Sequence, residues 1–173
     1  MAAIRHLDGE YILDHLSPSQ GSFEWLDKAT VRYRFSVHVR YSPHCYSETI
    51  DGDIPEAAYT FGDSSGTRMF SIDRHAHSLL VPGMIHALFS KPTSAVGLTY
   101  EDNWSIYSLQ MQPPMEPGKT FYIFFRLRKS DPPLADGNCA LELYVESGYA
   151  RSTPVHIRQR MTFGAAALAA HKK

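Results

Sequence analysis

The chain has 173 residues, a length that suits one ordinary domain with a sizeable core and excludes a second full domain. Its 17 lysines and arginines against 18 aspartates and glutamates give a formal net charge of -1, which excludes a global field that attracts nucleic acid or an anionic membrane. Aromatic residues make up 12% of the chain and argue against disorder. We therefore expect one domain over residues 1–173 that meets any charged partner through a local patch.

The composition of the chain favours a cytoplasmic protein with no membrane partner. The first twenty residues carry charges from Arg5 to Asp14 and contain no apolar run of the kind that a secretory signal needs. No apolar run elsewhere approaches the length of a membrane span. Cys45 and Cys139 lie far apart without CxxC spacing, so we expect two free thiols in a reducing compartment.

The elements expected in the first part of the chain begin with a short helix over residues 3–16, where apolar residues recur at roughly helical spacing. A strand over 31–41 is much clearer, because every odd position from Val31 to Tyr41 is apolar. A period of two residues is typical of a strand with one buried face. Residues 46–68 carry turn signals and are expected to form a loop, with a short strand at 57–61.

Helices are expected next. Asp73 is a candidate N-cap for a helix over 74–80, and apolar residues at helical spacing continue to Leu88. Pro82 lies inside this pattern and removes a backbone hydrogen bond, so we expect a kink or two short helices, with Pro82 opening the second. Strands are expected at 95–100, 104–112, 121–128, 140–145 and 155–163. Residues 164–173 form either a further helix or a flexible tail.

This order predicts an α+β domain, in which a mainly antiparallel sheet of five to six strands carries a kinked helix, or two short helices, on one face. In layout it is similar to the small ribonuclease toxins of the RelE and barnase-like group, although no motif carries a catalytic residue across. The residues expected in the core are Phe35, Val37, Val39, Leu80, Ile85, Leu88, Ile123, Phe125, Leu141, Leu143 and Ile157.

Arginines are concentrated on the outward positions of three predicted strands. The planar guanidinium group suits bidentate phosphate binding, so these residues are candidate ligands for RNA or for another phosphorylated molecule. The alternative is that they form cross-strand salt bridges with Glu142 and Glu146, in a protein that docks a protein partner. The arginines in this set are Arg32, Arg34, Arg40, Arg126, Arg128, Arg158 and Arg160.

Histidines beside these arginines are candidates for proton transfer. Cleavage of RNA without a metal ion needs a base for the 2′-hydroxyl, cations for the charge that develops on phosphorus, and an acid for the leaving oxygen. His38 and His44 are the candidate bases, because an imidazole titrates near neutral pH. The other members of this set are Arg40 and Arg126 as charge stabilisers and His156 or Tyr149 as the acid.

A metal or a cofactor is not expected. His75 and His77 are a possible metal pair, but residues two apart on a helix do not share a face. The chain contains no GxxxxGK[ST], GxGxxG or HExxH motif. The sequence therefore predicts binding of RNA or another phosphorylated ligand, with endoribonuclease activity as the sharper form and a non-catalytic protein–protein interaction module as the alternative.

Overall fold

The structure is a computed structural model, and it describes residues 2–28, 30–50, 52–64, 66–99, 106–110, 117–130 and 139–173. Its largest sheet has seven strands, in the order β12-β8-β9-β10-β11-β4-β3. Their bounds are β3 (Ser19–Asp27), β4 (Val31–Tyr41), β8 (Ala95–Thr99), β9 (Ile106–Gln110), β10 (Thr120–Lys129), β11 (Cys139–Arg151) and β12 (Ile157–Thr162).

The remaining strands form two smaller sheets. One has the order β5-β7-β6 and the other is the pair β1-β2. Their bounds are β1 (Ala3–His6), β2 (Gly9–Ile12), β5 (Ser47–Thr49), β6 (Thr60–Asp63) and β7 (Gly66–Phe70). The helices are α1 (Ile72–Ser78), α2 (Val81–Ser90) and α3 (Phe163–His171), and single 3-10 turns form η1 (Asp14–Leu16) and η2 (Pro43–Cys45).

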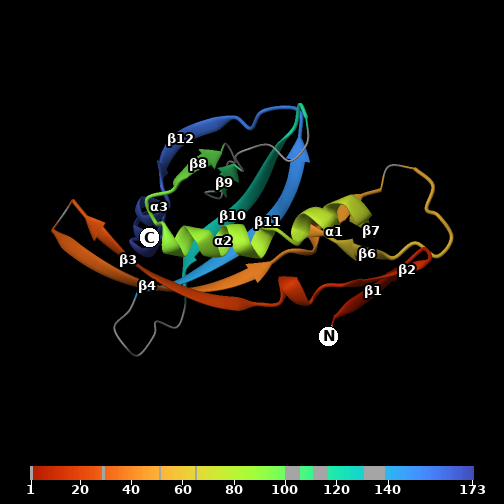
Figure 1. Ribbon diagram of the computed structural model, residues 1–173, viewed down its shortest axis with the longest axis horizontal. Helices are drawn as coiled ribbons and strands as arrows, with labels where there is room; N and C mark the ends of the chain where they lie inside the picture. Colours follow the sequence, from red (N-terminus) through yellow and green to blue (C-terminus); the bar gives the residue numbers. More distant parts are fainter. Residues whose placement is uncertain are drawn as a thin grey trace.

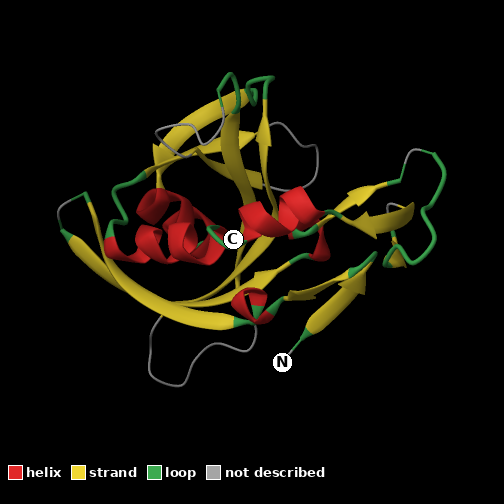
Figure 2. Ribbon diagram, turned by 45° about the vertical axis from the view of Figure 1, so that its right-hand side comes forward, coloured by secondary structure: helices red, strands yellow, loops and turns green. Residues whose placement is uncertain are grey.

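The large sheet curls around helices α2 and α3 (Figures 1 and 2). Helix α3 contacts strands from both halves of the sheet, namely β3, β8, β10, β11 and β12. The approach is closest at Gly164, where a Cβ atom would lie 2.1 Å from Cε3 of Trp25. The helices therefore fill the inner face of the sheet, and the opposite face of β10 and β11 is left for other contacts.

Buried and exposed side chains alternate along β4, as the apolar and polar positions of residues 31–41 predict. Phe35 and Val37 are 0% and 1% exposed, whereas the side chain of Arg34 is 66% exposed. Apolar side chains of β4 pack on the helices, and the arginines point to the other face. The prediction of one buried and one outward face for this strand is confirmed.

The α+β class is confirmed, but the sheet is larger and less regular than predicted. It has seven strands instead of five to six. Strands β11 and β4 are parallel, and all other neighbouring strands of this sheet are antiparallel. Strand β3 was not predicted, because Ser19–Asp27 offers few apolar residues and one of its inner positions is Gly21. The predicted strand at 104–112 lies partly outside the described residues, which include β9.

The predicted helix over 3–16 is wrong, because these residues form the hairpin β1–β2 and then η1. Ile4 and His6 alternate inward on β1, with 5% and 4% exposure, while Leu7 takes the turn with a φ of 53°. The rings of His6 and Tyr11 pack on Phe70. A contact with a distant strand thus outweighs the local helical spacing.

Two helices form where a kink or two short helices were predicted, and a proline occupies the first turn of α2. Leu80 and Ile157 were predicted in the core, and these two predictions are wrong. Leu80 is 38% exposed because it lies in the turn between the helices. Ile157 is half-buried beside a register irregularity of the edge strand β12.

The end of the chain is a packed helix rather than a flexible tail. Phe163, Ala166 and Ala167 on α3 are fully buried in the core cluster, and Thr162 caps the helix by accepting a hydrogen bond from the Ala165 N–H. No helix in the described ranges combines the length and the apolar character that a membrane crossing requires. That residues 1–173 form one domain stays a prediction.

Candidate functional site

Glutamates pair with most of the arginines that the sequence singled out. Nη1 of Arg40 lies 3.1 Å from Oε1 of Glu142, and Arg128 pairs with the second oxygen of the same carboxylate. The other pairs on this face of β3, β4, β10 and β11 are Arg32 and Arg34 with Glu24, and Arg126 with Glu146. These arginines therefore form the cross-strand salt bridges that the sequence suggested as the alternative to phosphate binding.

The seven arginines lie in two groups on the large sheet. Strands β4, β10 and β11 lie side by side, and the residues paired across them place Arg40 and Arg126 on either side of Tyr144. Arg158 and Arg160 lie instead on β12, at the opposite edge of the seven-stranded sheet. In strand order, β8 and β9 separate these two arginines from those of β10 and β4.

A β-bulge shapes the outer face of β10 and β11. Phe125 pairs with Val145 and Phe124 with Ser147, so Glu146 is the extra residue. A bulge inserts one residue and redirects the side chains that follow it. Odd-numbered residues of β11 are buried from 141 to 145, whereas from 147 onward the even position 148 is buried and the odd ones are partly exposed. The bulge therefore places polar side chains where the alternation predicts core residues.

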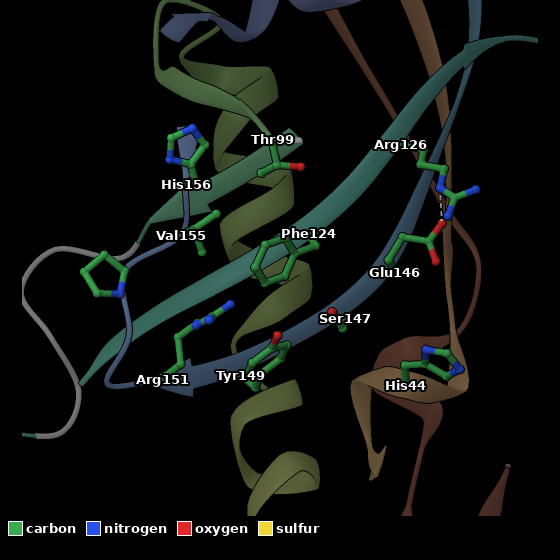
Figure 3. A pocket seen from close by; sticks show the side chains of 11 residues that line it. His44, Thr99, Phe124, Arg126, Glu146, Ser147, Tyr149, Arg151, Val155 and His156 are labelled. Atoms are coloured by element: carbon green, nitrogen blue, oxygen red, sulfur yellow. Dashed lines mark ion pairs between the residues drawn. The ribbon is translucent and has the colours of Figure 1, made fainter. Parts of the chain in front are cut away.

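These side chains line a cavity of about 520 Å³, a volume within the range of small-molecule sites. Figure 3 shows Phe124, Tyr149 and Arg151 near its middle, His44 at one end and His156 at the other. The residues that line the cavity are His44, Thr99, Phe124, Arg126, Glu146, Ser147, Tyr149, Arg151, Pro154, Val155 and His156.

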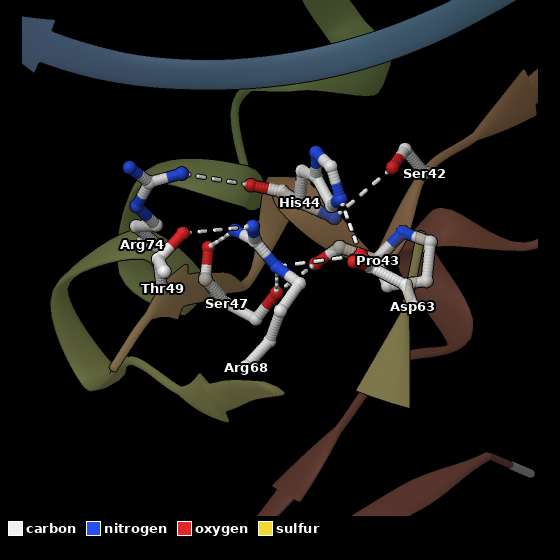
Figure 4. Close-up of polar contacts among 8 residues, drawn as sticks. All are labelled: Ser42, Pro43, His44, Ser47, Thr49, Asp63, Arg68 and Arg74. Carbon is white, nitrogen blue, oxygen red and sulfur yellow. Dashed lines mark hydrogen bonds and ion pairs between the residues drawn. The ribbon is translucent and has the colours of Figure 1, made fainter. Parts of the chain in front are cut away.

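Asp63 holds the imidazole of His44 at this cavity. Nε2 of His44 lies 2.7 Å from Oδ2 of Asp63, and Figure 4 shows this contact. An ionised carboxylate only accepts hydrogen bonds, so Nε2 is the donor to Asp63, and in the neutral ring Nδ1 has the lone pair. The His44 side chain is 32% exposed. The ring is thus fixed in one tautomer and stays within reach of a ligand.

The backbone around His44 is held by local hydrogen bonds. Ser42 opens η2 by accepting a hydrogen bond from the His44 N–H, at 3.1 Å, and donates its own N–H to the Val145 carbonyl on β11 at 2.8 Å. Ser47 donates its hydroxyl to the Pro43 carbonyl at 2.8 Å. These contacts fix the turn that carries His44 against the strand that carries the rest of the cavity.

The guanidinium group of Arg68 lies next to the carboxylate of Asp63 (Figure 4). Arg68 is 5% exposed, and its Nε lies 3.8 Å from Oδ2 of Asp63. The same guanidinium group donates to the Ser47 hydroxyl and carbonyl. Burial lowers the pKa of Arg68 from its ordinary value, and Asp63 opposes that effect. This arginine is therefore part of the scaffold behind the His44–Asp63 pair.

Arg74 on α1 contacts both His44 and Tyr149. Its Nη1 donates to the His44 carbonyl at 3.1 Å, and its guanidinium carbon lies 4.7 Å from the centre of the Tyr149 ring. A cation over an aromatic face is attracted by the ring quadrupole. One side chain thus orients both the turn that bears His44 and the ring of Tyr149.

Cys45, next to His44, is not available as a nucleophile. It is 0% exposed, and burial raises the pKa of its thiol to about 12, so the thiolate is scarce at neutral pH. Within the described ranges, no three histidine, cysteine, aspartate or glutamate side chains are arranged to hold a metal ion. His75 and His77, the pair considered from the sequence, both lie on α1.

The structure brings together four of the six residues that the sequence suggested for RNA cleavage. His44, Arg126, Tyr149 and His156 all line the cavity. His38 and Arg40 do not; both lie on the outward face of β4, where the residue paired with His38 on β11 is Glu142. Among the predicted ligand-binding arginines, only Arg126 lines this cavity.

The comparisons with known proteins identify a family. The YjaZ family model matches residues 4–172. The chain belongs to the YjaZ family. The comparison with curated proteins and the comparison with solved structures each return no match. The family description states no activity.

Sequence reasoning missed Asp63, Arg74 and Arg151 as members of the site. Short strands and loops separate Asp63 and Arg74 from His44 in the sequence, and no spacing rule connects them. Arg151 carried a detectable signal, because 147, 149 and 151 alternate with the small residues Gly148 and Ala150. The predicted strand ended at Val145, before the bulge, and this alternation was therefore not used.

Proposed function

We propose that the cavity on β10 and β11 binds RNA and cleaves it without a metal ion. The observation that carries the proposal is the set of side chains that line this single cavity. They comprise an imidazole in a fixed tautomer, a phenol, two arginines and an aromatic ring, contributed by His44, Tyr149, Arg126, Arg151 and Phe124. A base, an acid and cations are the groups that cleavage of a ribose phosphodiester requires.

In the proposed reaction, Nδ1 of His44 accepts the proton of the ribose 2′-hydroxyl. The 2′-oxygen forms a bond to phosphorus while the bond from phosphorus to the 5′-oxygen breaks. Tyr149 donates its hydroxyl proton to the leaving 5′-oxygen, and Arg126 stabilises the negative charge that develops on the phosphoryl oxygens. The products are a 2′,3′-cyclic phosphate and a 5′-hydroxyl end.

Phe124 and Arg151 supply binding in this proposal. The ring of Phe124 is half-buried at the cavity and lies 5.7 Å from the ring of Tyr149, centre to centre, so its remaining exposed surface suits contact with an unpaired base. The side chain of Arg151 forms no ion pair or hydrogen bond with any residue in the described part of the chain. Its guanidinium group is therefore available for a phosphate.

The test is an assay of the unaltered protein with mixed single-stranded RNA in buffer that contains a chelator of divalent ions. We expect fragments that end in a 2′,3′-cyclic phosphate, and an RNA affinity that falls as salt rises, because neutralised phosphates release counterions. RNA that stays intact, together with no affinity at low salt, would overturn the proposal. That outcome would favour the protein–protein interaction module, in which the arginine–glutamate pairs are only structural.

A further inference from the structure

A second cavity adjoins the first on the same face of the large sheet. It has a volume of about 330 Å³ and is lined by residues of β8, β10 and β12 together with Gln110 of β9. Pro154 and Val155 line both cavities, so the segment between β11 and β12 forms a wall that they share. The two cavities are therefore neighbouring parts of one surface.

Each cavity carries one arginine whose charge is not offset. Arg151 lines the first and Arg160 the second. Neither guanidinium group forms an ion pair or a hydrogen bond with a residue that the structure describes. The arginines of β4 and β10 differ in this respect, because each of them is paired with a glutamate. Glu24 is shared by Arg32 and Arg34, and Glu142 by Arg40 and Arg128. Arg151 and Arg160 differ from these arginines because their guanidinium groups have no ion-pair partner in the described part of the chain.

An aromatic row connects the cavities. The ring of Phe124 lies 5.7 Å from that of Tyr149, which lines the first cavity, and 6.1 Å from that of Tyr122, which lines the second. Tyr122 is 7% exposed and is one of the residues that line its cavity. Aromatic side chains between positively charged ones are typical of surfaces that bind single-stranded nucleic acid.

We infer that the two cavities are consecutive subsites for one single-stranded RNA. In this arrangement, Arg151 binds one backbone phosphate and Arg160 binds a neighbouring one, with the chain crossing the wall at Pro154 and Val155. The inference rests on the proposed function and adds that the substrate is single-stranded and occupies at least two phosphate sites. A mononucleotide fills the first cavity only.

The test compares Arg160→Gln with the unaltered protein in binding to a fluorescent uridine hexanucleotide and, by competition, to uridine monophosphate. We expect the variant to lose about ten-fold or more in affinity for the hexanucleotide, since a hydrogen bond between charged groups is removed. Its slope of log affinity against log salt should become shallower by about 0.7, the contribution of one phosphate of a single strand. Affinity for the monophosphate should stay within two-fold.

Arg5→Gln is the matched control, because this substitution changes the net charge by the same amount. Arg5 is exposed on β1 and lines neither cavity. Unchanged hexanucleotide affinity and slope in Arg160→Gln would overturn the two-subsite inference and leave the proposed function standing. Equal affinity of the unaltered protein for a blunt RNA duplex would overturn the single-strand requirement. No binding of either probe by the unaltered protein would overturn the proposed function itself.

Discussion

Replacement of His44 by alanine should lower the rate of RNA cleavage by about two to four orders of magnitude, which is the usual contribution of a general base. RNA affinity should change only a few-fold, since a neutral imidazole contributes at most one ordinary hydrogen bond of about 1 kcal/mol. The measurement is single-turnover cleavage with excess protein, together with affinity for a substrate whose 2′-hydroxyls are methylated and which therefore cannot be cleaved.

Two comparisons make this prediction specific to His44. Added imidazole should restore part of the rate in His44→Ala, because the cavity left by the side chain lies at the protein surface. His38→Ala tests the competing assignment, in which the base lies on the outward face of β4. A large loss of rate in His38→Ala with little change in His44→Ala would contradict the site described above.

Replacement of Phe125 by alanine should have the largest effect on stability. Phe125 is 0% exposed and belongs to the core cluster, and its ring lies 6.2 Å from that of Phe163 on α3. Removing a buried phenylalanine ring costs about 3–5 kcal/mol, against a total stability of about 5–15 kcal/mol for a domain. Urea denaturation followed by circular dichroism should therefore show a large fall in the unfolding midpoint.

Phe124→Ala is the matched control, because the neighbouring residue makes the same chemical change on the other face of β10. Phe124 is half-buried, and its ring contacts with Tyr122 and Tyr149 are worth about 0.5–1.5 kcal/mol each. We expect a smaller loss of stability and a weaker RNA affinity, since a base–aromatic stack contributes about 1–3 kcal/mol. Equal unfolding midpoints for the two variants would contradict the assignment of the two faces.

The parts of the fold that follow local patterns were predictable from the sequence. The alternation of residues 31–41 predicted which side chains of β4 are buried, and Pro82 predicted the break between α1 and α2. Elements that depend on distant contacts were not predictable in this way. The hairpin β1–β2 packs on Phe70, and β11 pairs with β4 across about a hundred residues of intervening chain.

The residue types of the candidate site were predictable from the sequence, but their position on the sheet was only partly predictable. Residue types named from the sequence, including His44, Arg126, Tyr149 and His156, meet at one cavity. The row of arginines on β4 predicts a different binding surface, because the sequence does not reveal that these arginines form ion pairs with Glu24 and Glu142. The bulge at Glu146 also reverses the parity of β11, and an alternation rule cannot anticipate an inserted residue.

The central claim is that RNA binds at the cavity and not along β4. The most direct test compares Arg151→Gln with Arg32→Gln. Both variants remove one positive charge, but Arg151 lines the cavity, whereas Arg32 is 72% exposed on β4 and pairs with Glu24. The measurement is affinity for a single-stranded RNA at constant low salt. We expect Arg151→Gln to lose about ten-fold or more and Arg32→Gln to stay within two-fold; the reverse order would contradict the account.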